Sequence, residues 1–206
     1  MGEPRNIVIL GATGSIGTSA IRVIRKHPDR FRLCGVAGFN RSGKLAEIVN
    51  EFRVPHAAVV CEQTSAEAEA DSLFPGFCRL HAGTEGLIEL ACLPEAERVL
   101  VAVVGSAGLH PTLAAIEQGK SIAIANKEIL VMAGSFIMEA ARRHGAQLLP
   151  TDSEHSAIFQ CLHGRDPEDV AVDRLILTAS GGPFLDTPPN TLDAVTPEAA
   201  LKHPNW

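Results

Sequence analysis

The segment ILGATGSIG, residues 9–17, decides the fold, because it sets a glycine-rich turn between an apolar run and an amphipathic segment. Its three glycines stand three apart, unlike the commoner G-x-G-x-x-G order. Such glycines let backbone N–H groups approach a pyrophosphate, and the start of the following helix offers partial positive charge. Thr13 and Ser15 add hydroxyl donors. The turn predicts dinucleotide binding; the alternative is a tightly packed helix entry without a ligand.

Apolar runs and helical patterns alternate after this turn. NIVIL precedes it, a helix is expected over 15–26, and LCGVA, a helix near 44–51 and AAVV follow. RVLVAVV, a helix opened by Pro111 and closed by Gly119, SIAIA and a longer helix ending near 142–145 continue the rhythm. We therefore predict an α/β fold with a Rossmann-like, doubly wound and mostly parallel sheet.

The pattern changes after about residue 150. RLILTASGG, residues 174–182, predicts a further strand that ends in a glycine-rich turn. The following segment is rich in Pro, Thr and Asn and has little periodicity, which is typical of a functional loop or lid. We expect an NADPH-binding domain over 1–150. Residues 151–206 are expected to begin an α+β catalytic domain with a substrate-covering loop.

Composition excludes several classes of protein. The 206 residues are 46% hydrophobic, enough for a globular core, and carry a net charge of −6 without a basic block. Neither nucleic acid nor a membrane surface is therefore an expected partner. No apolar run approaches the roughly 20 residues of a membrane span, and no signal or transit peptide is recognisable, so a cytoplasmic location is expected. Five scattered cysteines without a C-x-x-C pair predict reduced thiols.

Residues 33–44, LCGVAGFNRSGK, indicate which dinucleotide binds. NAD-binding folds carry an acidic residue about 20 residues after the turn, where it accepts the ribose 2′-hydroxyl. No Asp or Glu occurs here, whereas Asn40, Arg41 and Ser42 could bind a 2′-phosphate. NADP(H) is therefore favoured over NAD(H). The alternative is that Arg41 and Lys44 are ordinary solvated charges.

The segment PTDSEHSAIF, residues 150–159, predicts a metal site. Asp152 and Glu154 are two apart, so in an extended segment both carboxylates point to one side, as Mg²⁺ or Mn²⁺ would require. Ser153 between them could contact a substrate. The alternative is a helix opening, with Asp152 or Ser153 as N-cap and Glu154 in the first turn. A third ligand should exist, because two carboxylates are few for a tight divalent site.

Two further segments could join this site. ANKE ends a strand with Asn126, Lys127 and Glu128, where the Lys127 ammonium could stabilise a phosphate or an enolate-like oxygen. The alternative is a solvated lysine at a helix start. TASGGPF offers Ser180 and glycine amides as an anion nest, with a simple turn as the alternative.

Five motifs together, GATGSIG, ANKE, PTDSEHSAIFQCL, LTASGGPF and TPEAALKHPNW, closely resemble the 1-deoxy-D-xylulose 5-phosphate reductoisomerase family in order and separation. The resemblance runs from about Asn6 to Trp206. It implies an NADPH-dependent enzyme of isoprenoid biosynthesis that uses Mg²⁺, Mn²⁺ or Co²⁺. Such an enzyme isomerises and reduces 1-deoxy-D-xylulose 5-phosphate to 2-C-methyl-D-erythritol 4-phosphate, by retro-aldol cleavage and re-addition followed by hydride transfer. A small phosphorylated sugar as substrate, and a homodimer at full length, are implied as well.

The resemblance also implies roles for the matching positions. The metal ligands are Asp152 and Glu154, and the catalytic residues are Lys127 and Glu154. The substrate contacts are Ser153, Glu154, Ser180 and His203, with Trp206 packing over the substrate on the same loop as His203. The cofactor contacts are Thr13, Gly14, Ser15, Ile16, Gly38, Asn40, Arg41, Asn126, Lys127 and Glu128.

The sequence departs from the family in two places. Phe39 stands where many members have a basic or small residue, so the 2′-phosphate contact is expected from Arg41 or from backbone amides. Members are also much longer, and the resemblance places the third metal ligand and a helical C-terminal domain after Trp206. We therefore expect the 206-residue form alone to lack activity. A stand-alone NADP-binding module and another Rossmann oxidoreductase are the alternatives.

Overall fold

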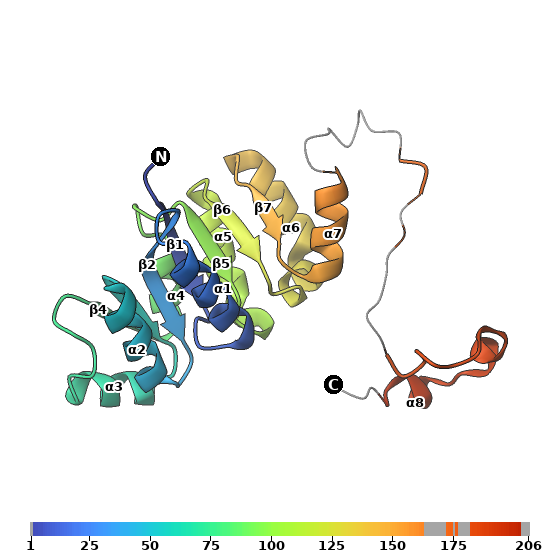
Figure 1. Cartoon of the computed structure of the whole chain (residues 1–206), viewed down its shortest axis with the longest axis horizontal. Coiled ribbons are helices and arrows are strands. Elements are labelled where there is room, and N and C mark those ends of the chain that lie inside the picture. Colours follow the sequence, from blue (N-terminus) through green and yellow to red (C-terminus); the bar gives the residue numbers. More distant parts are fainter. Residues whose placement is uncertain (1, 163–171, 175, 177–181, 203–206) are drawn as a thin grey trace. The chain divides into compact units, whose positions relative to one another are not determined.

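The structure, a computed structural model, describes residues 2–162, 172–174, 176 and 182–202 (Figure 1). The chain divides into two compact units, Met1–Asp152 and Ser153–Trp206. The strands of the first unit are β1 Arg5–Leu10, β2 Phe31–Gly38, β3 His56–Val59, β4 Arg79–Ala82, β5 Arg98–Val101, β6 Ser121–Ile124 and β7 Leu148–Pro150. Its helices are α1 Ser15–Lys26, α2 Ser42–Phe52, α3 Glu62–Ala70, α4 Gly83–Ala91, η1 Gly105–Gly108, α5 Leu109–Glu117 and α6 Glu128–His144.

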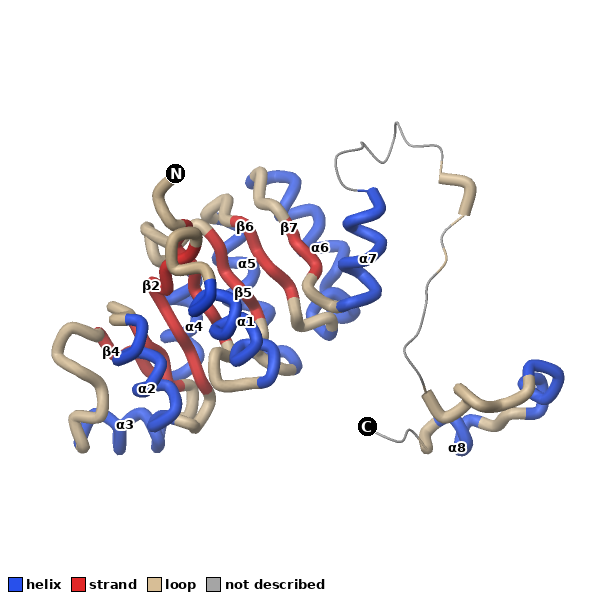
Figure 2. The backbone as a smooth tube through the Cα atoms, in the orientation of Figure 1, coloured by secondary structure: helices blue, strands red, loops and turns tan. Residues whose placement is uncertain are grey.

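The strands form one seven-stranded sheet in the order β4-β3-β2-β1-β5-β6-β7 (Figure 2). Every neighbouring pair is parallel, which confirms the predicted doubly wound α/β fold. The chain builds one half outward from β1 and then returns to start the other half at β5. The crevice beyond the carboxyl ends of β1 and β5 is therefore the place where this class of sheet binds ligands.

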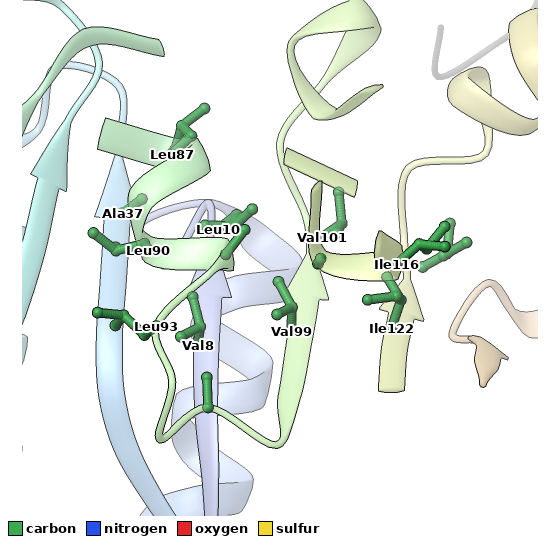
Figure 3. Close-up of a cluster of buried hydrophobic side chains, with 14 of the residues drawn as sticks. Val8, Leu10, Ala37, Leu87, Leu90, Leu93, Val99, Val101, Ile116 and Ile122 are labelled. Atoms are coloured by element: carbon green, nitrogen blue, oxygen red, sulfur yellow. The ribbon is translucent and has the colours of Figure 1, made fainter. Parts of the chain in front are cut away.

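The core lies on both faces of the sheet, because successive strand residues point to opposite sides. Val8 and Leu10 pack with residues of α4, α5 and α6 in one cluster, which Figure 3 shows around Leu87, Leu90 and other labelled side chains. Ile9, between them, packs with residues of α1 and α2 in the second cluster. This two-sided burial explains why the strand sequences read as continuous apolar runs.

Helix boundaries follow local signals in the sequence. The predicted helix over 15–26 is confirmed as α1, whose buried Gly17, Ile21 and Ile24 form one stripe toward the sheet. The helix α6 ends where Gly145 takes a left-handed conformation with φ of 63°. The helix expected to open at Pro111 instead begins at Leu109, because η1 runs directly into it.

The second unit is described only in part. Its elements are α7 Ser153–Leu162, η2 Pro189–Ala194 and α8 Pro197–Ala200. The strand expected within 174–182 lies mostly outside the described residues. In the part of the chain that the structure describes, no helix is long and apolar enough to cross a membrane.

Cysteine chemistry follows from burial. All five cysteines are free thiols, and Cys34 in β2 is 3% exposed. Burial, together with the Glu95 carboxylate, raises the pKa of the Cys34 thiol to about 12. Because the thiolate is the reactive form, we expect iodoacetamide at neutral pH to leave Cys34 unmodified in the native protein and to modify it after denaturation. Mass spectrometry of tryptic peptides measures this, with exposed Cys161 as the internal control. Equal native labelling of both cysteines would contradict the burial.

Candidate functional site

The glycine-rich turn joins β1 to α1, and its glycines differ in what they permit. Gly11 has a φ of 95°, and a Cβ there would lie 2.5 Å from the carbonyl oxygen of Ala102. A Cβ on Gly17 would overlap the backbone of Gly11 and Ala12. Gly14 is different: its φ is −80°, and a Cβ would meet only the carbonyl oxygen of Gly11, at 3.4 Å. Packing therefore requires Gly11 and Gly17, whereas the space above Gly14 stays open to a ligand.

A cavity of about 290 Å³ lies beside this turn. The predicted cofactor residues in its lining are Thr13, Gly14, Gly38, Asn40 and Arg41. The lining is completed by residues outside the predicted set of cofactor contacts, of which Gly11 lies in the predicted turn and Phe39 at the predicted 2′-phosphate position: Gly11, Phe39, Val60, Leu87, Ala102, Val103, Val104 and Ala107. Most of the added residues follow strand ends, so the carboxyl ends of β3 and β5 carried a usable signal. Predicted residues outside the lining are Ser15, Ile16, Asn126, Lys127 and Glu128.

The cavity fits part of a dinucleotide. Gly14 caps α1 without a side chain to accept its first-turn amides, and that turn carries no acidic residue. An anion can therefore approach the helix start, which favours negative charge. Val60, Leu87 and Val103 give the cavity an apolar wall that suits a base and a ribose edge. NADPH is thus compatible with both the chemistry and the position of this cavity.

Asn126 is 2% exposed and ties two loops together. Its Nδ2 donates to the carbonyl oxygens of Val103, at 2.7 Å, and Gly105, at 2.8 Å. Its Oδ1 accepts from the backbone N–H of Ile129 at 3.2 Å. The amide therefore fastens the start of α6 to the loop after β5. Cofactor contact by Asn126 stays a prediction.

Lys127 and Asp152 meet at the carboxyl ends of adjacent strands β6 and β7. Lys127 Nζ lies 3.2 Å from Asp152 Oδ2, with the lysine side chain 57% and the aspartate side chain 21% exposed. The sequence placed both residues at strand ends, and parallel pairing brings such ends together. The Asp152 carboxylate and the Lys127 ammonium thus form an ion pair at the carboxyl-terminal edge of the sheet. The cavity beside the glycine-rich turn lies at the same edge.

The segment after Asp152 is not extended. Helix α7 begins at Ser153, with Glu154 in its first turn and Ser153 Oγ donating to Glu154 Oε2 at 2.7 Å. The expected extended backbone is therefore wrong after Asp152, and the helix start with Glu154 in its first turn agrees with the alternative. Metal binding by Asp152 and Glu154 stays a prediction. The unit boundary falls between Asp152 and Ser153.

The described residues contain only two of the predicted metal ligands. Asp152 and Glu154 supply hard oxygen ligands, which suit Mg²⁺ or Mn²⁺. Among the described residues, however, no group of three or more His, Cys, Asp or Glu side chains could hold a metal ion. Three other residues with predicted roles, Ser180, His203 and Trp206, lie outside the described part of the chain.

Two family models match the chain. One, described as 1-deoxy-D-xylulose 5-phosphate reductoisomerase, matches residues 7–134. The other, described as the C-terminal domain of that enzyme, matches residues 148–206.

Curated relatives of that name match along the whole chain. The relative from Stutzerimonas stutzeri (strain A1501) is 48% identical over 211 residues, which cover 100% of this chain and 53% of the relative. The relative from Bacillus cereus (strain Q1) is 50% identical over 202 residues, covering 98% and 52%. The chain therefore spans about half the length of the curated relatives it matches.

Solved structures agree with these relatives. The reductoisomerase from Zymomonas mobilis in complex with NADPH has a TM-score of 0.84 at 39% identity, covering 98% of this chain and 52% of that one. A second, a DOX-P reductoisomerase in complex with NADPH, fosmidomycin and magnesium, has a TM-score of 0.80 at 41% identity and the same coverage.

Proposed function

Because the chain belongs to the 1-deoxy-D-xylulose 5-phosphate reductoisomerase family, we propose that it takes part in the NADPH-dependent conversion of 1-deoxy-D-xylulose 5-phosphate to 2-C-methyl-D-erythritol 4-phosphate in isoprenoid biosynthesis. The family membership confirms the resemblance seen in the sequence. The observation that carries the proposal is the common edge of the sheet: the cavity beside the glycine-rich turn and the Lys127–Asp152 pair both lie at carboxyl ends of its parallel strands. Hydride transfer requires the cofactor and a polar substrate to bind next to each other, and the cavity and the ion pair would provide these two binding places.

The cofactor role falls to residues 1–150. In this proposal the pyrophosphate lies over Gly14 at the start of α1, where no side chain intrudes. The adenine lies against the apolar wall and Phe39, which is 62% exposed and lines the cavity. Asn40 and Arg41 face the ribose end. The protein thereby orients the nicotinamide and excludes water, while the cofactor supplies the hydride.

The substrate role is shared with residues 151–206, the beginning of a catalytic domain. Asp152 and Glu154 would hold a divalent cation, and Ser153, Ser180 and His203 would contact a small phosphorylated sugar. When bound, Mg²⁺, Mn²⁺ or Co²⁺ supplies Lewis-acid polarisation of substrate oxygens. The Lys127 ammonium, 3.2 Å from Asp152, holds that carboxylate in place and adds positive charge where a substrate oxygen would lie.

NADPH binding and turnover together test the proposal. We expect micromolar NADPH affinity of this chain from fluorescence titration. In a protein of the relatives' full length that contains this sequence, we expect NADPH oxidation that requires both 1-deoxy-D-xylulose 5-phosphate and a divalent metal. The second candidate is a nucleotide-binding module without catalysis. It is favoured by the cavity, whose lining lies wholly within the first unit. It is also favoured by the absence, among the described residues, of any group of three or more metal-ligating side chains. Tight NADPH binding without turnover under any metal would select the second candidate.

The preference for NADPH over NADH tests the proposed position of the ribose more directly than binding of NADPH alone. Asn40→Asp places a carboxylate in the cavity at the ribose end, where it repels a 2′-phosphate and can accept from a 2′-hydroxyl. We expect the affinity for NADPH to fall about tenfold or more, about 1.4 kcal/mol or more, with NADH affinity unchanged or improved. The two dissociation constants measure this. Asn50→Asp adds the same charge in α2 away from the cavity and serves as the control. An unchanged NADPH to NADH ratio in Asn40→Asp would contradict the placement.

We also propose a homodimer and a cytoplasmic location, with neither nucleic acid nor a membrane as partner. The family resemblance supports the dimer, and five free thiols suit a reducing compartment. Light scattering and cell fractionation test these two points.

A further inference from the structure

Three cations gather beside the glycine-rich turn: Arg22 from α1, Arg41 before α2, and Lys44 within α2. We call them the basic patch. They line one open hollow of about 670 Å³ together with polar residues of the turn and of α1. Those polar residues are Thr13, Gly14, Ser15, Thr18 and Ser19. Hydroxyls and cations are the groups that recognise a phosphate dianion.

Two of the cations converge on one oxygen. Lys44 Nζ lies 3.5 Å and Arg41 Nη1 lies 3.4 Å from the carbonyl oxygen of Thr13. Lys44 Nζ also donates to Thr18 Oγ1 at 3.3 Å. Arg22, which also lines the hollow, donates from Nη2 to Ser19 Oγ at 3.1 Å. The shared carbonyl oxygen holds the like charges of Arg41 and Lys44 near one another, and Arg22 lines the same hollow, an arrangement that an anion in the hollow would stabilise.

Two carboxylates, Glu47 and Glu51, line a neighbouring groove together with Arg22 and Lys44, but neither forms an ion pair with the basic patch in the part of the chain that the structure describes. None of the ion pairs in the described residues involves Arg22, Arg41 or Lys44. Arg25, less than one turn beyond Arg22, is different, because both its Nε and Nη2 donate to the Glu51 carboxylate.

The hollow adjoins the cofactor cavity. Thr13, Gly14 and Arg41 line both. In the cavity lining Arg41 carries a positive charge while Phe39, at the position after Gly38, carries none, and the other two cations of the basic patch line the hollow. We propose that Arg22 and Lys44, with Arg41, hold the 2′-phosphate of NADPH and set the preference for NADP over NAD. This inference rests on the proposed cofactor function.

The test compares ligands that differ only in the phosphate. Arg22→Gln and Lys44→Gln should each lower the affinity for NADPH and for 2′,5′-ADP about tenfold, because each removes a charge-assisted contact. Affinity for NADH and 5′-AMP should stay within about twofold, because neither ligand carries the 2′-phosphate. Calorimetric titration gives all four constants. Lys44→Arg retains the charge and should retain the preference.

Arg25→Gln is the matched control, since it removes the same charge from the same helix but breaks only contacts away from the hollow, with Glu51 and the Phe52 ring. Its NADPH to NADH ratio should equal that of the unmodified protein. Equal losses for phosphorylated and unphosphorylated ligands, or no loss, would overturn the inference. An unmodified protein that binds NADPH and NADH equally would overturn it as well, while leaving the dinucleotide site intact. An unmodified protein that binds neither would instead refute the proposed function.

Discussion

Gly17→Ala is expected to lower the free energy of unfolding by about 2 kcal/mol and to abolish measurable NADPH binding at micromolar concentrations. The added methyl overlaps the backbone of Gly11 and Ala12, so neither side can yield by a rotamer change. Alanine gains about 1 kcal/mol in helix propensity, but the overlap outweighs it because the turn itself must move. Urea denaturation and NADPH titration measure the two effects.

Gly14→Ala is the matched comparison in the same turn. Its methyl meets only the carbonyl oxygen of Gly11 at 3.4 Å, an ordinary contact, and its φ of −80° suits alanine. Stability should therefore fall by no more than about 1 kcal/mol, the difference between glycine and alanine at a helix N-cap. NADPH affinity should still fall at least about tenfold, because the methyl occupies the space assigned to the pyrophosphate. Normal NADPH binding by Gly14→Ala, or normal stability of Gly17→Ala, would refute this division of roles.

Asp152→Asn should lower metal-dependent turnover about a hundredfold or more while leaving the dissociation constant of NADPH nearly unchanged. The amide removes a charged metal ligand and the partner of Lys127, but Asp152 lies outside the cofactor cavity. Turnover is measured as NADPH oxidation in a protein of the relatives' full length that contains this sequence.

The control for this loss is Asp71→Asn, which removes a charge from the exposed end of α3. It should leave both turnover and metal dependence intact. Loss of NADPH affinity in Asp152→Asn, with metal activation preserved, would count against Asp152 as a ligand. Glu154→Gln should repeat the effect of Asp152→Asn if the two carboxylates serve one ion.

Strands and turns with strong patterns were predictable, and elements without a pattern were not. The turn over 9–17 and the strand ends gave five of the cavity residues, because glycine spacing and strand position are local properties. The segment EQTSAEAEA has good helix formers but no apolar residues at helical spacing, and the only buried residues of α3 are Ser65 and Ala68, so no amphipathic pattern marked this helix. The strand β4 is four residues long, and its place at the sheet edge depends on pairing with β3. Such elements form through tertiary contacts.

Side-chain direction was the other limit. Leu87 lines the cavity from α4. The sequence pattern of an apolar helix residue is the same whether its side chain faces a ligand or the core, so this contact could not be predicted. The spacing of Asp152 and Glu154 implied a common side only if the backbone stayed extended. At Ser153 the backbone becomes helical instead of staying extended, and the Glu154 carboxylate in the first turn favours this helix start.

The buried amide of Asn126 has a thermodynamic consequence. Its Nδ2 donates to the carbonyl oxygens of Val103 and Gly105, and Val103 lines the cofactor cavity. Its Oδ1 accepts from the backbone N–H of Ile129 in the first turn of α6, close to Lys127. Asn126 thus makes a hydrogen-bonded connection between the loop that lines the cavity and the start of α6, next to the residue that pairs with Asp152. Coupling free energy between two binding sites is reciprocal. If NADPH binding in the cavity raises the affinity for the metal or the substrate, then binding of the metal or the substrate raises the affinity for NADPH by the same factor.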